Sequence, residues 1–233
     1  MDQRSSVLNR QYKLRFGNRD PYRDSVWKIL CSQYFSKHIP ARSVVLDVGC
    51  GWGEFINNIS AARKFAMDLN SETGQRVGSD VTFLQQDCAL EWALDTASLD
   101  VVFTSNFLEH LPDKRSVEAT LAQAYRCLKA GGTIICLGPN VKCIPGDYWD
   151  FWDHHIPITE ASLAELLTLS GFTVESSIAR FLPYSMSNGR NPPLFLVSLY
   201  LRMPAAWYFF GKQFLVIGRK ADGTAGVRRE GER

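Results

Sequence analysis

The sequence lacks several features that would assign a chain to a class directly. Its six cysteines form no Cys-x-x-Cys pair, so a structural zinc site and a disulfide framework are both disfavoured. The formal net charge is only +2 and no dense Lys/Arg run lies outside the last residues, so charge gives no reason to expect nucleic acid as a partner. The charged N-terminus shows no signal peptide, and we therefore expect a cytoplasmic protein.

Long uninterrupted hydrophobic runs are missing as well. The most apolar segment, 194–210, is shorter than a comfortable membrane span and is interrupted by Arg202 and Pro204. We expect either a buried helix or an interfacial one that makes peripheral contact with a membrane. The chain does have 45% hydrophobic residues over 233 positions, which is enough for one large core.

Short apolar runs alternate with helical patterns through most of the chain. One helix is predicted over 115–129, where apolar residues recur at helical spacing before Gly131-Gly132 ends it. Such alternation is typical of α/β folds in which helices cover both faces of a mostly parallel sheet. The expected strands are 44–48, 64–69, 81–84, 99–104 and 133–138.

The C-terminal part departs from this alternation. Thr159 is a candidate N-cap for a helix that runs to about Ser170-Gly171. Two further strands are predicted at 172–182 and 213–219, and no ordinary crossover helix precedes the second. Residues 221–233 are polar and charged, which predicts a disordered tail.

The most informative stretch is VVLDVGCGWGEF, residues 44–55. Its apolar run ends in Gly49, Gly51 and Gly53, and a helical pattern follows directly. This indicates a buried strand that turns sharply into a helix, with no Cβ atoms where a ligand would lie against the backbone. Asp68 ends the next apolar run, where an acid that binds a ribose is expected. The pattern favours a protein that holds an adenosine-type cofactor.

Two classes of cofactor compete for this loop. Nicotinamide and flavin enzymes usually space their glycines as Gly-x-Gly-x-x-Gly, which brings a helix N-terminus to a pyrophosphate. Here the spacing is Gly-x-Gly-x-Gly and Glu54 follows at once, which suits a zwitterionic or cationic ligand better. Because the glycine spacing does not suit a pyrophosphate, a nicotinamide-dependent oxidoreductase is the alternative with less support.

Three further motifs follow in order along the chain. Asp87 follows the third strand, where its carboxylate could accept a hydrogen bond from an adenine amino group. The turn Leu-Glu-His-Leu at 108–111 follows the fourth strand, and Leu-Lys-Ala-Gly-Gly at 128–132 precedes the fifth. Together with the glycine loop and Asp68, these motifs resemble the class I S-adenosylmethionine-dependent methyltransferases, in particular the type 11/type 23 branch that includes ubiquinone-pathway O-methyltransferases. The match covers residues 43–140.

The resemblance implies a fold, a cofactor and a set of contacts. The fold is a Rossmann-like, doubly wound, seven-stranded sheet, mostly parallel, whose last strand runs antiparallel between the fifth and the sixth. The cofactor is S-adenosylmethionine, and its product is S-adenosylhomocysteine. The implied contacts are Gly49, Gly51 and Gly53 under the methionine part, Asp68 on the ribose hydroxyls, Leu69, Asp87 and the Cys88 amide at the adenine, and Asn106 and Phe107 near the sulfonium.

The loop after the fifth strand, 141–158, should overhang the pocket, because ligands of open α/β sheets bind at the carboxyl ends of the strands. It carries four aromatic residues, three acids and the pair His154-His155. We interpret it as a lid over the methyl acceptor, with His154 or His155 as general base and Asp150 or Asp153 orienting it. The alternative is that the aromatics only anchor the loop and a histidine caps the next helix. No metal site is predicted, since no third ligand stands at suitable spacing.

These features predict a methyltransferase domain at 43–220 that contains an apolar insertion at 185–210. The preceding segment, 1–42, is predicted to be helical and to cap the cofactor site. We expect methyl transfer by in-line displacement to a small-molecule or lipid-linked acceptor, with a hydroxyl oxygen as the preferred atom. A methyltransferase-like domain that binds without turnover is the non-enzymatic alternative. A nucleic-acid enzyme is disfavoured because Thr-Ser-Asn-Phe at 104–107 replaces the Asn/Asp-Pro-Pro-Tyr/Phe motif of amino-directed enzymes.

Overall fold

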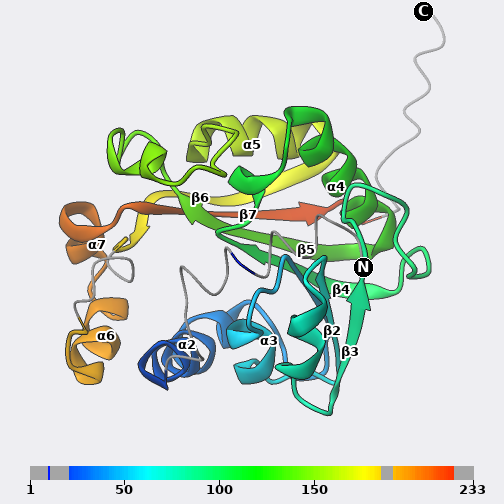
Figure 1. Cartoon of the computed structure of the whole chain (residues 1–233), viewed down its shortest axis with the longest axis horizontal. Coiled ribbons are helices and arrows are strands. Elements are labelled where there is room, and N and C mark those ends of the chain that lie inside the picture. The colour runs from blue at the N-terminus through cyan, green and yellow to red at the C-terminus, as the bar shows by residue number, and fades with distance from the viewer. Residues whose placement is uncertain (1–9, 11–20, 185–190, 223–233) are drawn as a thin grey trace, which may run out of the picture.

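The structure, a computed structural model, describes Arg10, residues 21–184 and residues 191–222, and its centre is one twisted sheet (Figure 1). Seven strands of these residues pair in the order β3-β2-β1-β4-β5-β7-β6. They are β1 Val44–Val48, β2 Arg63–Asp68, β3 Val81–Gln85, β4 Leu99–Ser105, β5 Leu128–Pro139, β6 Phe172–Leu182 and β7 Gln213–Lys220.

The direction of the strands confirms the predicted fold class. The first five strands pair in parallel, and β7 is antiparallel to both of its neighbours, β5 and β6. The last strand therefore lies between the fifth and the sixth, as the family resemblance implies. Because β6 runs in the same direction as β5, the carboxyl ends of six strands share one edge of the sheet.

Helices cover both faces of the sheet (Figure 1). On one face lie α4, Lys114–Cys127, and α5, Glu160–Leu169; on the other lie α2, Pro21–Gln33, and the short α3, Glu54–Asn58. Each face has its own hydrophobic core. Since central strands such as β1 and β4 are buried on both sides, their sequences are nearly continuous apolar runs, which is why the sequence located them well.

The core under α2 is built from aromatic rings. Trp27 of α2 meets Phe103 of β4 at a centroid distance of 6.1 Å, and Phe103 stacks on Phe55 of α3 at 3.5 Å. The predicted N-terminal helical stripe is therefore part of the main core. Most of residues 1–20 lie outside the described residues, and with them most of the segment that we expect to cap the cofactor site.

The glycine pair 131–132 corrects one expectation. Helix α4 already ends at Cys127, and β5 begins directly at Leu128, so the two glycines lie inside a strand rather than ending a helix. The pairing of β4 with β5 shifts register between Leu99 and Val101, which marks a bulge. Gly131 has φ +71°, and a Cβ on Gly132 would lie 2.9 Å from a backbone oxygen. The bulge therefore requires glycine at both positions.

The C-terminal elements agree with the sequence. Thr159 caps α5 through a reciprocal capping box with Ser162, as its N-cap assignment predicts. The apolar segment 194–210 forms two short helices, α6 Leu194–Leu201 and α7 Pro204–Phe210. In the part of the chain that the structure describes, none of the helices combines the length and apolar character that crossing a bilayer requires. The remaining short helices are η1 Phe35–Lys37, η2 Ser71–Gln75, η3 Leu108–His110 and η4 Asp147–Asp150.

Two expectations fall partly outside the described residues. The start of the insertion, 185–190, is not described, and neither is most of the tail, 223–233. All six cysteines are free, in agreement with a sequence that shows no disulfide framework.

Candidate active site

The residues predicted to hold a cofactor come from the carboxyl ends of neighbouring strands. The glycine loop follows β1, Asp68 ends β2, and Asn106 and Phe107 follow β4. Since β1 lies between β2 and β4 in a parallel arrangement, these ends meet at one edge of the sheet. This is the edge at which open α/β sheets bind their ligands.

The backbone conformation of the loop favours glycine at all three positions. Gly49, Gly51 and Gly53 have φ angles of +68°, +55° and +79°, a region that other residues rarely adopt. A Cβ on Gly49 would lie 2.1 Å from Cγ of Phe107, so the Phe107 ring lies directly on the loop backbone. The loop is thus a tight backbone cradle with an aromatic ring at its β4 side.

Asp68 fixes the shape of this loop. Its carboxylate accepts a hydrogen bond from the Gly51 amide at 3.0 Å and another from the Asn70 amide at 2.8 Å. The buried Thr73 hydroxyl donates to the Gly51 carbonyl at 2.8 Å. Asp68 therefore joins the glycine loop to the residues that follow β2.

The site is acidic. Asp47 is fully buried, and burial together with the charges of Glu54 and Asp68 raises its pKa well above its usual value. Glu54 is also buried, and Nε of Arg23 from α2 lies 3.0 Å from its carboxylate. Three acidic side chains therefore lie close together at this edge, and one of them is paired with Arg23.

The predicted adenine contacts lie on the adjoining strand. Gln85 of β3 pairs with Asp68, and Asp87 follows two residues later, with Oδ1 accepting a hydrogen bond from the Ala89 amide at 2.9 Å. The Cys88 side chain is turned inward, where the Thr120 hydroxyl lies 3.3 Å from Sγ and burial raises the thiol pKa to about 11. Only the Cys88 backbone is therefore suited to a ligand.

Two more residues of the predicted site have distinctive local structure. Asn106 has φ +49°, an uncommon conformation for a residue other than glycine, and its Nδ2 donates to the Ser105 hydroxyl at 2.9 Å. Leu69 is half-buried, and its carbonyl accepts a hydrogen bond from Nε2 of Gln85 at 3.4 Å. Both residues directly follow a strand of the sheet's ligand-binding edge.

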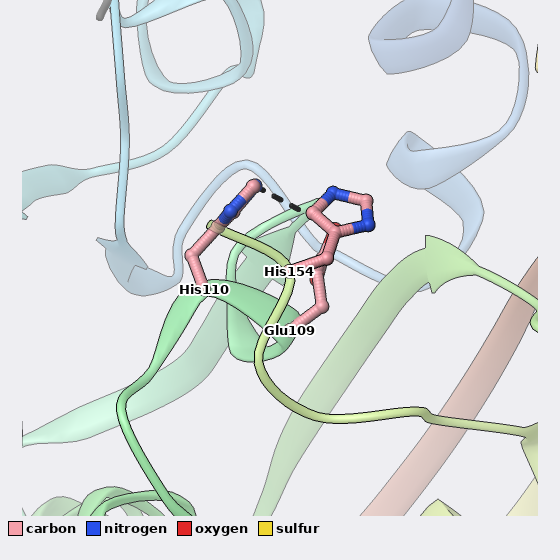
Figure 2. A group of neighbouring side chains, drawn as sticks. All are labelled: Glu109, His110 and His154. Carbon is pink, nitrogen blue, oxygen red and sulfur yellow. Dashed lines mark ion pairs between the residues drawn. The ribbon is translucent and has the colours of Figure 1, made fainter. Parts of the chain in front are cut away.

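A second cluster joins the turn after β4 to the loop after β5. Figure 2 shows Glu109, His110 and His154, whose ligand atoms all lie within 4.8 Å of one another. The two imidazole centroids are 4.7 Å apart. Asp153, expected to orient His154 or His155, lies with Oδ2 3.1 Å from Nδ1 of His110. His155 is exposed, and its amide donates to the Glu109 carbonyl at 2.9 Å.

Sequence reasoning missed the participation of Glu109 and His110. In the sequence, the Leu-Glu-His-Leu turn serves only to identify the family. The signal was nevertheless present, because two titratable residues lie in the first turn after a strand that ends at the ligand-binding edge.

The aromatic residues of the lid loop divide into two groups. Tyr148 is buried, and its hydroxyl donates to the Ile156 carbonyl, which closes the loop on itself. Burial and the Glu109 charge raise the pKa of Tyr148 above its usual value. Trp149 and Trp152 are instead 51% and 91% exposed. The first residue anchors the loop, and the other two present apolar surface outward.

Comparisons with known proteins agree with this geometry. The family model described as "Methyltransferase domain" matches residues 22–177. No curated protein matches the chain.

Solved structures share the fold at low sequence identity. A chain from the complex of the Haloferax volcanii Trm112 methyltransferase activator with a methyltransferase has a TM-score of 0.64 and 18% identity, covering 95% of this chain and 99% of that one. A SAM-dependent methyltransferase from Archaeoglobus fulgidus also scores 0.64 at 18% identity, covering 91% and 99%. A Thermotoga maritima enzyme described as a possible histamine N-methyltransferase scores 0.63 at 17%, covering 93% and 96%.

Proposed function

Because the chain belongs to the methyltransferase domain family, we propose that it moves a methyl group by in-line displacement to a hydroxyl oxygen of a small-molecule or lipid-linked acceptor. Family membership confirms the resemblance found in the sequence and makes the protein an S-adenosylmethionine-dependent enzyme. When bound, S-adenosylmethionine supplies a methyl group activated by a cationic sulfonium. The task of the protein is to align an acceptor with this group and to exclude water.

The proposed cofactor site is the glycine loop with its neighbouring strand ends. The loop of Gly49, Gly51 and Gly53 would hold the methionine part, and the Asp68 carboxylate would bind the ribose hydroxyls. The Asp68 carboxylate at this edge would suit the positive charge of the sulfonium. This loop, with three positive-φ glycines fixed by one carboxylate, is the observation that carries the proposal.

The remaining proposed contacts follow the strand order. Leu69, Asp87 and the Cys88 amide would meet the adenine, because they follow β2 and β3. Asn106 and Phe107 would line the floor near the sulfonium, since the Phe107 ring lies on Gly49.

Proton removal from a hydroxyl acceptor is proposed for the lid loop. His154 or His155 would act as the base, as the sequence predicts. Both lie next to the turn that carries Phe107, since His155 bonds to Glu109 and the His154 ring meets the His110 ring. An imidazole near neutral pH suits the removal of a hydroxyl proton, whereas a neutral amine nucleophile needs no base before attack.

The apolar insertion supports an acceptor held at a membrane surface. It follows β6, whose carboxyl end lies at the ligand-binding edge, and it places α6 and α7 beside α2 and the end of β6 (Figure 1). Phe209 and Phe210 are 73% and 64% exposed, and Arg202 is exposed between the two helices. Residues 191–212 contain no acidic side chain. Such a surface favours contact with an anionic bilayer, from which a lipid-linked hydroxyl would enter.

The test is transfer of tritiated methyl groups from S-adenosylmethionine to matched phenol and aniline acceptors. Each acceptor is supplied both free in water and on an alkyl chain in anionic phospholipid vesicles. We expect label on the phenols, with preference for the vesicle-held one. The double variant Phe209→Ser/Phe210→Ser should lose that preference, whereas Leu169→Ser, which removes a 79% exposed leucine from α5, should keep it.

Each arm of this experiment can overturn one part of the proposal. Label on anilines alone would overturn oxygen as the acceptor atom. Equal labelling of free and vesicle-held phenols would overturn the membrane surface. No label on any acceptor, with S-adenosylhomocysteine still bound, would overturn acceptors of this class.

A further inference from the structure

We propose that Glu109, His110 and His154 bind a divalent transition-metal ion beside the cofactor site. Two imidazole nitrogens and one carboxylate oxygen approach within 4.8 Å of one another, although His154 comes from a different loop than the other two. In Figure 2 the His110 ring lies beside the His154 ring, and the dashed line marks the approach of His110 to Glu109. Metal binding by these residues does not depend on the proposed function; only the role of the ion does.

The cluster is close to the dimensions of a bound ion. Ligand atoms around tetrahedral zinc lie about 3.4 Å apart, as bond lengths of roughly 2.0–2.2 Å require. Nε2 of His110 is already 3.9 Å from Oε1 of Glu109. Since the three ligand atoms lie within 4.8 Å of one another, binding one ion requires them to move closer together. The mixed nitrogen and oxygen set favours Zn²⁺ or Mn²⁺ over Ca²⁺, which prefers oxygen ligands alone.

Asp153 supplies the outer support that metal-binding histidines usually have. Both its backbone oxygen and its Oδ2 lie 3.1 Å from Nδ1 of His110. An acceptor on that side favours the tautomer with the proton on Nδ1, which leaves the lone pair of Nε2 on the side of Glu109. A carboxylate behind a histidine also makes the imidazole a stronger ligand.

The surroundings hold the ligands rigidly and leave one side open. Glu109 is 2% exposed and His154 5%, and the His154 ring packs on Tyr148 and Phe151 at centroid distances of 4.6 and 4.9 Å. The His110 side chain is 24% exposed, so the cluster is reachable from solvent. Three protein ligands with an accessible further position are typical of catalytic rather than structural zinc sites.

The position suggests what the ion would do. Glu109 follows Phe107 by two residues, so an acceptor hydroxyl on the ion would lie beside the predicted sulfonium floor. A bound divalent ion lowers the pKa of a coordinated hydroxyl and prepares it for attack. In this arrangement His154 is a ligand, and His155 is the residue left to take the proton. This role rests on the proposed function.

The test is calorimetric titration of the full, chelator-treated chain with Zn²⁺. We expect one equivalent to bind, with affinity reduced at least about tenfold by His110→Ala or by His154→Ala. Asp153→Asn should weaken binding by about 10–100-fold, since it removes the outer charge and leaves the ligands in place. His155→Ala is the matched control, because it deletes a neighbouring imidazole that is not a ligand, and its zinc affinity should equal that of the wild type.

Binding of S-adenosylhomocysteine reports whether each variant is folded. The proposal is overturned if the folded wild type takes up no zinc, or if folded His154→Ala binds zinc as tightly as the wild type does, which would place the ion on cysteines or elsewhere. Zinc binding without methyl transfer to any phenol supports the metal site and overturns the acceptor assignment. Methyl transfer to phenols by a protein that binds no zinc supports the acceptor assignment and overturns the metal site.

Discussion

Replacing Asp68 by alanine should weaken cofactor binding without unfolding the protein. The carboxylate uses one oxygen for the Gly51 amide and the other for the Asn70 amide, at 3.0 and 2.8 Å. We assign to the same carboxylate the binding of the two ribose hydroxyls. The substitution therefore removes the proposed ribose contacts and one anchor of the loop together.

The expected magnitude follows from the kind of bond that is lost. Hydrogen bonds to a charged group contribute about 1.5–3 kcal/mol each, and water restores part of that to a partly open site. We expect a total loss of roughly 1–3 kcal/mol, which raises the dissociation constant for S-adenosylhomocysteine by about 5–150-fold. Calorimetric titration measures this directly.

Thr73→Val separates the ribose contacts from the anchoring of the loop. It deletes the hydrogen bond from the Thr73 hydroxyl to the Gly51 carbonyl, 2.8 Å long, and preserves both the volume of the side chain and the Asp68 carboxylate. We expect less than about a threefold change in affinity, since one neutral hydrogen bond is worth roughly 1 kcal/mol and acts only on the loop. Unchanged affinity in Asp68→Ala, or equal losses in both variants, would show that Asp68 does not bind the ribose.

Two further predictions concern stability. Gly131→Ala should lower the free energy of unfolding by about 1–2 kcal/mol in urea titrations, because φ is +71° and the new Cβ would lie 2.6 Å from Oδ1 of Asp222. The control is Gly146→Ala, which should leave the free energy of unfolding almost unchanged, because φ is −81° and no atom lies within 4 Å of the new Cβ. The pKa of Asp47 is raised in the folded protein by burial and by the charges of Glu54 and Asp68. The protonated Asp47 carboxyl therefore contributes to stability, fully so below the unfolded pKa of 3.8. This contribution is lost as pH rises through the folded pKa. The unfolding free energy of the wild type should therefore fall relative to that of Asp47→Asn as pH rises above 4, and parallel curves for the two proteins would contradict this account.

The central strands could be predicted from sequence because they are short apolar runs buried on both faces, whereas the edge strand β6 alternates buried and exposed residues. The expected 44–48 and 172–182 coincide with β1 and β6, and 213–219 differs from β7 by one residue. The weakest prediction was around Gly131, where the rule that glycine ends a helix competed with the need for glycine in a bulge. Local sequence does not distinguish these, because the bulge depends on the register between β4 and β5.

The sequence by itself determined the class of fold, the family and the backbone cradle. These depend on local rules: apolar periodicity, the αL preference of glycine, and an acid that directly follows a strand. Only the tertiary structure decided that Glu109 and His110 meet His154, and that Asp153 lies behind His110. The physical reason is the order of the strands. Because β4 and β5 are parallel neighbours, the turn after one and the loop after the other leave the sheet at the same edge, and their separation along the chain carries no information about that contact.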